Sequence, residues 1–397
     1  MRRVLLLFAV PDGAGAMRMM FHFALAFRRK GYDVCLAHGD STAQSREISV
    51  VARDMLNQLA SSGIKCIPCA GFRMRSSRLL TNQLKAIVAE QDSQVLIGFH
   101  PLDFKYALSI AGKTKRACVL SLQNRQVFWG SSIARWIKAQ IFRYLLRRYA
   151  TRVVCTSDAV RDHLIEQFGA RPTRCRVIPN GIPIPDKVPD VGAVSGLRQS
   201  LSLSDDDLLL INTGRIDIQK GQDLLLAALE SIHARNWSLV LIGDVSEGRS
   251  TPEQKHFQDK LKSLISRNQW ESRVHFVGWR DDVDVFLAAA DIYIHTARWE
   301  GPSAPLAVME AMAAKLPIIM TDCCGRPDGF VDGVHGYVAQ SENEHSISQA
   351  VVQMLAHSSA ERREMGVRCR EMVEANYEIG RISTRFVEEV DSVVAAS

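Results

Sequence analysis

Residues 208–221 read LLLINTGRIDIQKG, and they indicate the fold class of the chain. The run from Leu208 to Asn212 is apolar and has the length of a buried strand, and a turn follows at Gly214. An amphipathic segment with the spacing of a helix begins at Gly221. Apolar strands that alternate with helices are typical of parallel sheets whose two faces are both covered. The stretch therefore predicts an α/β fold.

The same alternation extends in both directions from this stretch. Further strands are predicted at residues 4–10, 33–37, 64–68, 95–99, 118–122, 152–156, 239–243, 274–277, 292–295 and 316–320. Helices are predicted at residues 18–30, 45–61, 79–90, 157–168, 221–234, 253–266, 283–289 and 305–314. With 397 residues, the chain exceeds the size at which one hydrophobic core usually stops growing. We therefore expect two Rossmann-like domains, each built on a parallel sheet.

A proline-rich segment at residues 179–192 separates the two halves. It holds four prolines and can be neither a helix nor a central strand, so we interpret it as the interdomain linker. We expect the first domain at residues 1–182 and the second at 183–375. Residues 360–396 have a helical pattern, and we expect 376–397 to form a C-terminal helix that packs back on the first domain.

The formal net charge of +6 is distributed unevenly along the chain. Residues 1–180 hold 28 Lys and Arg against 11 Asp and Glu, out of 49 and 43 in the whole chain. The N-terminal half is therefore basic and the rest acidic, which indicates that the N-terminal half meets an anionic partner. A membrane leaflet, a phosphorylated acceptor and a nucleic acid would each fit, and cations that only solvate the surface are the alternative.

A basic amphipathic segment within this half runs from Ser131 to Arg148 and carries Trp136, Phe142 and Tyr144. Basic amphipathic helices with aromatic residues bind anionic membrane surfaces. A core-packed helix with a solvated basic face gives the same pattern and stays open as an alternative. Three further arginines lie nearby in the sequence and would add to a membrane-binding charge: Arg73, Arg75 and Arg78.

The cysteines and the apolar segments indicate a cytoplasmic protein. Nine cysteines occur at irregular spacings, which argues against a disulfide framework and for a reducing compartment. Cys66 and Cys69 have the spacing of a redox motif, but they fall in a predicted strand and are interpreted as structural thiols. No segment has the roughly eighteen apolar residues needed to span a bilayer, so any membrane contact is expected to be peripheral, at the inner face of the plasma membrane.

The loop that follows the strand at 208–212 carries two cations, Arg215 and Lys220. Open α/β sheets bind their ligands at the carboxyl ends of the strands. Two cations five residues apart at such an end can hold a diphosphate, with help from the backbone N–H groups of the loop. A solvated basic loop is the alternative.

A second candidate site lies at residues 296–313, TARWEGPSAPLAVMEAMA, directly after the strand at 292–295. A loop of small residues leads there into a helix, whose first N–H groups suit an anion. Glu310 lies inside this apolar helix. A buried carboxylate needs hydrogen-bond partners, and the hydroxyls of a ribose or a sugar are suitable ones.

Both candidate sites belong to a longer series of short motifs. The series comprises Pro179-Asn-Gly-Ile182, Gly214-Arg215, Lys220-Gly221, Ile242-Gly-Asp244, residues 274–283 (VHFVGWRDDV), Ala290-Asp-Ile292, Glu300-Gly, Glu310-Ala-Met-Ala313, Gly325, Pro327-Asp328, Asp332-Gly333 and Gly336. In this order the series resembles the nucleotide-binding domain of the GT-B glycosyltransferases, specifically glycosyltransferase family 4, over roughly residues 150–340. The first half is similar only through Gly13–Gly15 and Ser157-Asp-Ala-Val160.

The resemblance implies a GT-B architecture, in which two Rossmann-like domains with parallel sheets face a central cleft. It also implies the site residues. The donor-binding residues would be Gly13, Gly15, Gly214, Arg215, Lys220, Ala304, Leu306 and Glu310. The catalytic residues would be His100, Arg215, Lys220 and Glu300.

Within that set, the resemblance implies distinct roles. Arg215 and Lys220 would bind the pyrophosphate of the donor, and the glycine turn of the first domain would close over the phosphates. Glu310 would bind the ribose hydroxyls and Glu300 the transferred sugar, while His100 would lie near the acceptor hydroxyl. The family pattern has seven residues between its two glutamates, whereas Glu300 and Glu310 have nine between them. A two-residue insertion in the connecting loop would account for the difference.

The function that the resemblance implies is retaining transfer of a hexose or N-acetylhexosamine from a nucleotide diphosphate sugar to a glycan or lipid-linked acceptor in the synthesis of cell-surface polysaccharide, lipopolysaccharide or glycoconjugates. A UDP-sugar is favoured over a GDP-sugar. No metal and no cofactor are expected, because Arg215, Lys220 and helix N-termini would neutralise the leaving diphosphate. Asp282 and Asp284 have the spacing of a metal-binding motif, but they open a predicted helix and are interpreted as capping residues.

Three alternatives are weighed against this function. A sugar-nucleotide epimerase can use the same architecture and would consume the donor without an acceptor. A dinucleotide oxidoreductase is disfavoured, because Arg18 stands where its glycine fingerprint needs a third small residue. A non-enzymatic membrane- or nucleic-acid-binding protein would leave the donor-site series unexplained. The basic half also lacks the pattern of a known nucleic-acid module, so no nucleic-acid partner is expected.

Overall fold

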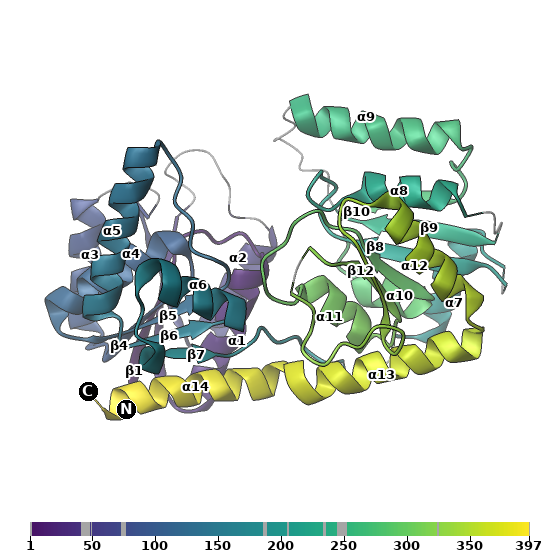
Figure 1. Cartoon of the computed structure of the whole chain (residues 1–397). Helices are drawn as coiled ribbons and strands as arrows, with labels where there is room; N and C mark the ends of the chain where they lie inside the picture. The colour runs from purple at the N-terminus through teal and green to yellow at the C-terminus, as the bar shows by residue number, and fades with distance from the viewer. Residues whose placement is uncertain are drawn as a thin grey trace. The chain divides into compact units, whose positions relative to one another are not determined.

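The computed structural model describes residues 2–40, 48, 50–72, 77–185, 189–204, 206–232, 236–243, 252–323 and 325–396. The chain divides into two compact units (Figure 1). Unit 1 consists of Met1–Gly181 together with Ile379–Ser397, and unit 2 consists of Ile182–Glu378. Some predicted features lie outside the described residues: the start of the helix expected at 45–61, and Arg73, Arg75 and Asp244.

Unit 1 is built on a parallel sheet of seven strands in the order β3-β2-β1-β4-β5-β6-β7. The strands are β1 (Arg3–Phe8), β2 (Asp33–Gly39), β3 (Lys65–Cys69), β4 (Val95–Gly98), β5 (Ala117–Leu122), β6 (Arg152–Cys155) and β7 (Cys175–Val177). Side chains of β1 alternate between the two faces, with Leu5 and Leu7 in one core and Val4 and Leu6 in the other. The strand is apolar throughout because both of its faces are covered.

Helices cover each face of this sheet. The core that contains Leu5 lies under α3 (Arg78–Glu90), α4 (Pro101–Thr114), α5 (Ser132–Tyr149) and α6 (Asp158–Phe168). The core that contains Val4 lies under α1 (Gly15–Arg29), α2 (Val50–Ser61) and α14 (Ile379–Ala395). The C-terminal helix α14 packs on α1, where Phe386 stacks on Phe23 with ring centroids 4.0 Å apart. A short 3-10 turn, η1 (Pro172–Arg174), precedes β7.

Unit 2 repeats this architecture with six parallel strands in the order β10-β9-β8-β11-β12-β13. The strands are β8 (Leu208–Thr213), β9 (Trp237–Ile242), β10 (Val274–Gly278), β11 (Ile292–His295), β12 (Ile318–Thr321) and β13 (Gly336–Ala339). One core packs against α8 (Gln222–Glu230), α9 (Pro252–Arg267) and α12 (Glu344–Ala356). The other packs against α7 (Val191–Ser200), α10 (Val283–Ala289), α11 (Leu306–Ala313) and α13 (Ser359–Tyr377).

Both sheets reverse their strand order at one point. In unit 1 the chain runs from β1 outward to β3 and returns to β4, next to β1. In unit 2 it runs from β8 to β10 and returns to β11, next to β8. Open α/β sheets bind ligands at the carboxyl ends of the strands at such reversal points. The predicted residues follow these four strands: Gly13 and Gly15 after β1, His100 after β4, Arg215 and Lys220 after β8, and Glu300 after β11.

The predicted fold class is confirmed, because both units are parallel α/β sheets of the Rossmann type. The strand predicted at 292–295 and the helix predicted at 283–289 coincide with β11 and α10. The short strands β7 and β13 are absent from the prediction, since runs of three and four residues carry little periodicity.

The helical pattern at residues 360–396 forms two helices, α13 and α14. Glu378 has an extended conformation, with φ −61° and ψ 127°, and separates α13 from α14. The two helices belong to different units, because unit 2 ends at Glu378 and unit 1 resumes at Ile379. Unit 1 ends at Gly181, one residue before the expected boundary at 182, and it resumes three residues after the expected start of the C-terminal helix at 376.

Cys66 and Cys69 both lie on β3 as free thiols. Burial raises the pKa of the Cys66 thiol to about 11 and that of the Cys69 thiol to about 12. A thiol with so high a pKa is a poor nucleophile at neutral pH, as expected of structural rather than redox-active cysteines.

Candidate active site

The loop between β8 and α8 is shaped by two glycines with positive φ. A Cβ atom on Gly214, whose φ is +150°, would lie 3.3 Å from Cε of Lys220, so the lysine side chain passes directly over this glycine. Gly221, whose φ is +67°, precedes α8. A Cβ atom there would lie 2.1 Å from the backbone oxygen of Thr296, so this position accepts only glycine.

The loop between β11 and α11 is bound to the β8–α8 loop by several hydrogen bonds. The Thr296 hydroxyl donates to the Gly221 carbonyl over 2.9 Å. The Arg298 backbone N–H donates to the Gln219 carbonyl over 2.8 Å, and the Gln219 amide returns a bond of 3.0 Å to the Trp299 carbonyl. These contacts hold two loops, eighty residues apart in sequence, in one arrangement.

Arg298 and Asp223 form the most buried ionic contact between these loops. The arginine donates to both carboxylate oxygens, over 2.7 and 2.9 Å, and to the Ile218 carbonyl over 2.9 Å. Lys260 of α9 adds a bond of 2.6 Å to the same carboxylate, which is 2% exposed. Burial alone would raise the pKa of Asp223, but the hydrogen bonds from Arg298 and Lys260 outweigh it and lower that pKa.

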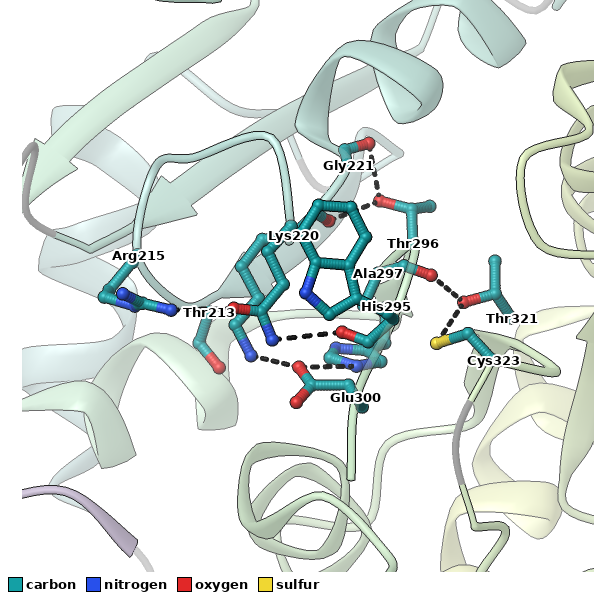
Figure 2. Close-up of polar contacts among 12 residues, drawn as sticks. Thr213, Arg215, Lys220, Gly221, His295, Thr296, Ala297, Glu300, Thr321 and Cys323 are labelled. Atoms are coloured by element: carbon teal, nitrogen blue, oxygen red, sulfur yellow. Dashed lines mark hydrogen bonds and ion pairs between the residues drawn. The ribbon is translucent and has the colours of Figure 1, made fainter. Parts of the chain in front are cut away.

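Lys220, Glu300 and His295 meet at the carboxyl ends of β8 and β11 (Figure 2). The Lys220 ammonium forms an ion pair with the Glu300 carboxylate, and both side chains are mostly covered. The His295 Nε2 atom lies 3.7 Å from the Glu300 carboxylate and has no hydrogen-bond partner within the described part of the chain. Burial, reinforced by the Lys220 charge, lowers the pKa of His295 to about 3. The imidazole is therefore neutral at physiological pH, and its contact with Glu300 is not an ion pair.

Arg215 lies on the same loop but does not join this cluster. Its guanidinium bonds to the Gln219 amide oxygen over 2.8 Å and lies 3.3 Å from the Asp217 carboxylate. The side chain is 60% exposed, and Figure 2 shows it to one side of the Lys220–Glu300 pair. Both predicted phosphate ligands are thus paired with a carboxylate, but the Lys220–Glu300 pair is mostly covered, whereas the Arg215 side chain is exposed to solvent.

The first turn of α11 presents backbone donors without a side-chain cap. Pro305 is its N-cap residue and makes no side-chain capping bond, and Ala304 and Leu306 flank it. Glu310, one turn further along, is half-buried rather than buried as predicted. Burial raises the pKa of Tyr293 on β11, and the charge of Glu310 adds to that rise.

The corresponding point of unit 1 is organised by a carboxylate that the sequence analysis did not single out. Asp103 is fully buried and accepts hydrogen bonds from the backbone N–H groups of Ala9 (2.6 Å), Phe99 (3.2 Å) and His100 (2.9 Å). It therefore joins the loop after β1 to the loop after β4. An acidic residue three positions after the helix cap is a known capping signal, and it could have identified Asp103.

His100 is the N-cap residue of α4, and its Nδ1 atom accepts a hydrogen bond of 3.2 Å from the Leu102 N–H. A neutral imidazole whose Nδ1 accepts carries its proton on Nε2. His100 thus has a donor, not a base, on its other ring nitrogen. In the loop after β1, Gly13 has a φ of +75°, and Gly15 is the first residue of α1.

Known proteins match both units of this chain. A sequence model described as Glycosyl transferases group 1 matches residues 195–372, and one described as Glycosyltransferase Family 4 matches residues 13–184. The crystal structure of HepE from Anabaena in complex with UDP superposes with a TM-score of 0.81 at 18% identity, over 99% of this chain and 100% of that one. The chain belongs to the GT-B glycosyltransferases of family 4. The predicted resemblance is therefore confirmed.

Two of the curated relatives are enzymes that transfer a sugar to lipopolysaccharide or to a diphosphoundecaprenol lipid. The lipopolysaccharide glucosyltransferase WaaG of Escherichia coli K12 is 26% identical over 217 residues, 53% of this chain and 54% of that protein. An Escherichia coli UDP-Gal:alpha-D-GlcNAc-diphosphoundecaprenol alpha-1,3-galactosyltransferase is 24% identical over 208 residues, 51% of each chain. The chain thus spans about half the length of the curated relatives it matches. This family member is therefore similar in sequence to a lipopolysaccharide glucosyltransferase and to a galactosyltransferase that acts on a lipid-linked sugar.

Glu300 and Glu310 are separated by two residues more than the family pattern has, and the connecting residues belong to the β11–α11 loop and the first turn of α11. A Cβ atom on Gly325 would lie 2.4 Å from the Pro302 carbonyl oxygen, so the loop after β12 packs closely against this stretch. Glu300 nevertheless reaches Lys220, so the added residues do not remove its carboxylate from the end of β8.

The interpretation of Asp282 as a capping side chain is wrong. It is the N-cap residue of α10 by position, but its side chain makes no capping bond. Its carboxylate accepts two hydrogen bonds from Arg280 instead, over 2.7 and 2.6 Å, because the arginine two residues earlier is the stronger donor. Within the described residues, no three His, Cys, Asp or Glu side chains form a group that could hold a metal ion.

Proposed function

We propose that this enzyme transfers a hexose or N-acetylhexosamine from a UDP-sugar to a glycan or lipid-linked acceptor, with retention at the anomeric carbon. The observation that carries the proposal is the Lys220–Glu300 ion pair at the point where the strand order of unit 2 reverses. The covered ammonium of Lys220 at this place can bind a phosphate, because a diphosphate can replace the Glu300 carboxylate as its partner. The UDP bound by HepE supports uridine as the base, and the relatives of glycan synthesis support the acceptor class.

The leaving diphosphate sets the main electrostatic demand of the reaction. When the bond between the anomeric carbon and the phosphate oxygen breaks, its electron pair leaves with the diphosphate. Lys220, the exposed guanidinium of Arg215 and the N–H groups at Ala304 and Leu306 would stabilise that charge, and no metal ion is required for it. Fixed cations and dipoles at such a place contribute strongly, because they need no reorganisation during the reaction.

The remaining predicted residues have roles that follow from their chemistry. The acceptor oxygen attacks the anomeric carbon from the face that the diphosphate leaves, and the acceptor proton passes to a departing phosphate oxygen. Glu300, released from Lys220 by the diphosphate, would hydrogen-bond the hydroxyls of the sugar. Glu310 would bind the ribose. The Nε2–H group of His100 would donate a hydrogen bond to the acceptor substrate and so orient it. Gly13 and Gly15 would let the backbone approach the phosphates.

The acceptor is proposed to be presented at the cytoplasmic face of a membrane. Within the described residues, no helix is both long enough and apolar enough to cross a bilayer. Contact with a membrane-bound acceptor would therefore be made by a surface of the folded chain, and the segment from Ser131 to Arg148 is the candidate.

The reaction is tested by incubating the purified protein with UDP-glucose, UDP-galactose, UDP-N-acetylglucosamine or GDP-mannose, with and without an Escherichia coli lipid extract as acceptor, and following the anomeric signals by NMR. The proposal predicts release of UDP only when the acceptor is present. Conversion of the donor without acceptor would instead identify an epimerase, and consumption of only the GDP-sugar would refute the choice of uridine.

The donor site is tested by calorimetric titration of UDP into wild-type protein and into Lys220→Ala. Loss of one charge-assisted contact is expected to weaken binding on the order of 10- to 100-fold. Lys262→Ala, which removes an exposed ammonium from α9, is the matched control and should bind UDP like the wild type. Equal affinity of Lys220→Ala and wild type would show that the phosphates bind elsewhere.

A further inference from the structure

The helix α5 in unit 1 is unusually exposed. Only Phe142 and Leu146 of its eighteen residues are buried. The aromatic residues that the sequence grouped together therefore separate: Phe142 belongs to the core, whereas Trp136 and Tyr144 are 64% and 62% exposed. A helix that packs through so few side chains has most of its surface available to a partner.

The first half of the outer face of α5 is apolar. Large apolar side chains follow one another here at helical spacing and in the preceding loop, and all are exposed: Val127, Trp129, Ile133, Trp136, Ile137 and Ile141. Trp129 is 81% exposed and Ile133 is 74% exposed. Isolated apolar residues on a surface need no explanation, but six large ones within fifteen residues indicate an interaction site.

The second half of the same face is cationic. Arg143, Arg147 and Arg148 line a depression of about 430 Å³ together with Gln140, Tyr144 and Arg171. Arg171 comes from a different segment, the turn after α6. That turn begins at Gly169, which ends α6 with a φ of +61° and lies against the Arg143 and Arg147 side chains.

None of these four arginines forms an ion pair with a carboxylate in the part of the chain that the structure describes. The neighbouring Arg161 differs, because it pairs with Asp158 and Asp162. Arg174 also differs, because it turns inward and donates to the Ala150 carbonyl over 2.8 Å. Four guanidinium groups around one depression repel each other unless an anion joins them, and guanidinium groups bind phosphate oxygens in pairs.

We infer that the outer face of α5 docks on an anionic phospholipid leaflet, with the arginine depression holding a lipid phosphate and the stretch from Trp129 to Ile141 entering the headgroup region. A free phosphate or a sugar phosphate would use the arginines alone and leave the adjoining apolar half without a role. A nucleic acid would use the arginines and aromatic rings but not three exposed isoleucines. An anionic leaflet matches both halves, since it places phosphates next to an apolar layer.

The role of this docking surface rests on the proposed function, in which the enzyme meets a membrane-bound acceptor. The binding of the surface to a membrane does not depend on glycosyl transfer. It adds Arg171, which lies outside the amphipathic segment, and it assigns separate tasks to the two halves of α5. The large apolar side chains enter the membrane, and the charged side chains, including those of Arg135 and Lys138 in the same stretch, meet the headgroups at their own level.

The test is flotation of the 397-residue chain with vesicles of phosphatidylcholine alone or mixed with phosphatidylglycerol. Wild-type protein is expected to bind the mixed vesicles at least about tenfold more tightly, because each cation near an anionic surface adds to the attraction. Arg147→Ala combined with Arg171→Ala should lower this affinity about tenfold or more. Trp136→Ser combined with Ile137→Ser should lower the affinity for the mixed vesicles as well.

The matched control is Arg53→Ala combined with Lys113→Ala, which removes two exposed cations from α2 and α4 of the same unit. It should bind vesicles like the wild type, and an equal loss would overturn the inference in favour of general charge attraction. Competition by inorganic phosphate together with unchanged binding of the Trp136→Ser/Ile137→Ser variant would overturn it in favour of a soluble phosphate. Tighter binding of single-stranded DNA than of the mixed vesicles would do so in favour of a nucleic acid.

UDP affinity is measured on the same variants and should not change. This readout separates the two proposals. Vesicle binding with the expected pattern in a protein that binds no UDP would refute the proposed function alone, whereas UDP binding without selective vesicle binding would refute only the docking surface.

Discussion

Arg298 donates two hydrogen bonds to Asp223, with Nη1 and Oδ1 2.7 Å apart and Nη2 and Oδ2 2.9 Å apart. The contact joins the loop after β11 to the first turn of α8. Neither residue was predicted to bind the donor or to act in catalysis, yet Arg298 stands two positions before Glu300 and Asp223 three positions after Lys220. The ion pair therefore positions the two side chains that are proposed to bind the donor.

Replacing Arg298 by Ala should destabilise the protein by about 2 kcal/mol, because the almost fully buried carboxylate of Asp223 loses one cation with its two hydrogen bonds and keeps only Lys260. Urea unfolding measures this loss. Arg267→Ala is the control, since Arg267 pairs with Glu230 at an exposed site where an ion pair contributes less than about 1 kcal/mol. Equal effects of the two substitutions would contradict a structural role for the Arg298–Asp223 contact.

Gly221→Ala should destabilise unit 2 by at least about 2 kcal/mol, because the new methyl group would meet the Thr296 carbonyl and force a positive φ on alanine. UDP affinity should fall with it, since the two loops can no longer approach. Gly196 of α7 is exposed and has open space around it, so Gly196→Ala should instead stabilise the protein by about 0.5 to 1 kcal/mol. Thermal and urea unfolding of both variants check the opposite signs.

His295 should make stability fall as the pH is lowered. Its pKa is about 3 in the folded protein against 6.5 for an ordinary histidine, so between these values the unfolded chain binds a proton that the folded protein does not. Stability contributed by the neutral imidazole is complete above pH 6.5 and is lost as the pH falls towards 3. Within this window the unfolding free energy should drop by up to about 1.4 kcal/mol per pH unit more in the wild type than in His295→Gln.

Urea unfolding of wild type and His295→Gln at pH 6.5 and at about pH 5 measures this difference. His256→Gln, on the exposed face of α9, is the control and should leave the wild-type pH dependence unchanged. Parallel pH profiles for wild type and His295→Gln would mean that the imidazole is not kept neutral by burial beside Lys220.

His100→Asn should separate acceptor handling from folding. Asparagine is a good helix N-cap, so α4 should keep its stability, but the ring Nε2–H is lost. We expect UDP affinity like that of the wild type and a fall in turnover on the order of 100-fold, the effect of removing one oriented donor. Transfer assays with saturating donor measure the turnover, and calorimetry measures the affinity. A variant with wild-type turnover would show that His100 acts only as a cap.

Much of the fold could be predicted from local patterns. The buried strands of both sheets are continuous apolar runs, and the positions of β11 and α10 coincide with the predicted segments. The break at Glu378 could not be predicted in this way, because α13 and α14 have helical periodicity on both sides of it. What separates them is the need of α14 to bury Phe386 and Ile382 in the core of unit 1 while α13 packs in unit 2.

By itself the sequence determined that this protein is an α/β chain of two Rossmann-like units, that Arg215 and Lys220 follow one strand, and that Glu300 follows another. Only the tertiary structure decided that Lys220 pairs with Glu300, that His295 is neutral beside them and that Arg298 reaches Asp223. Local periodicity predicts which residues form strands or helices, since the formation of either element depends on neighbours a few positions away in the sequence. Strand order places β11 beside β8 although two strands lie between them in the chain, and that order follows from the packing of the whole sheet.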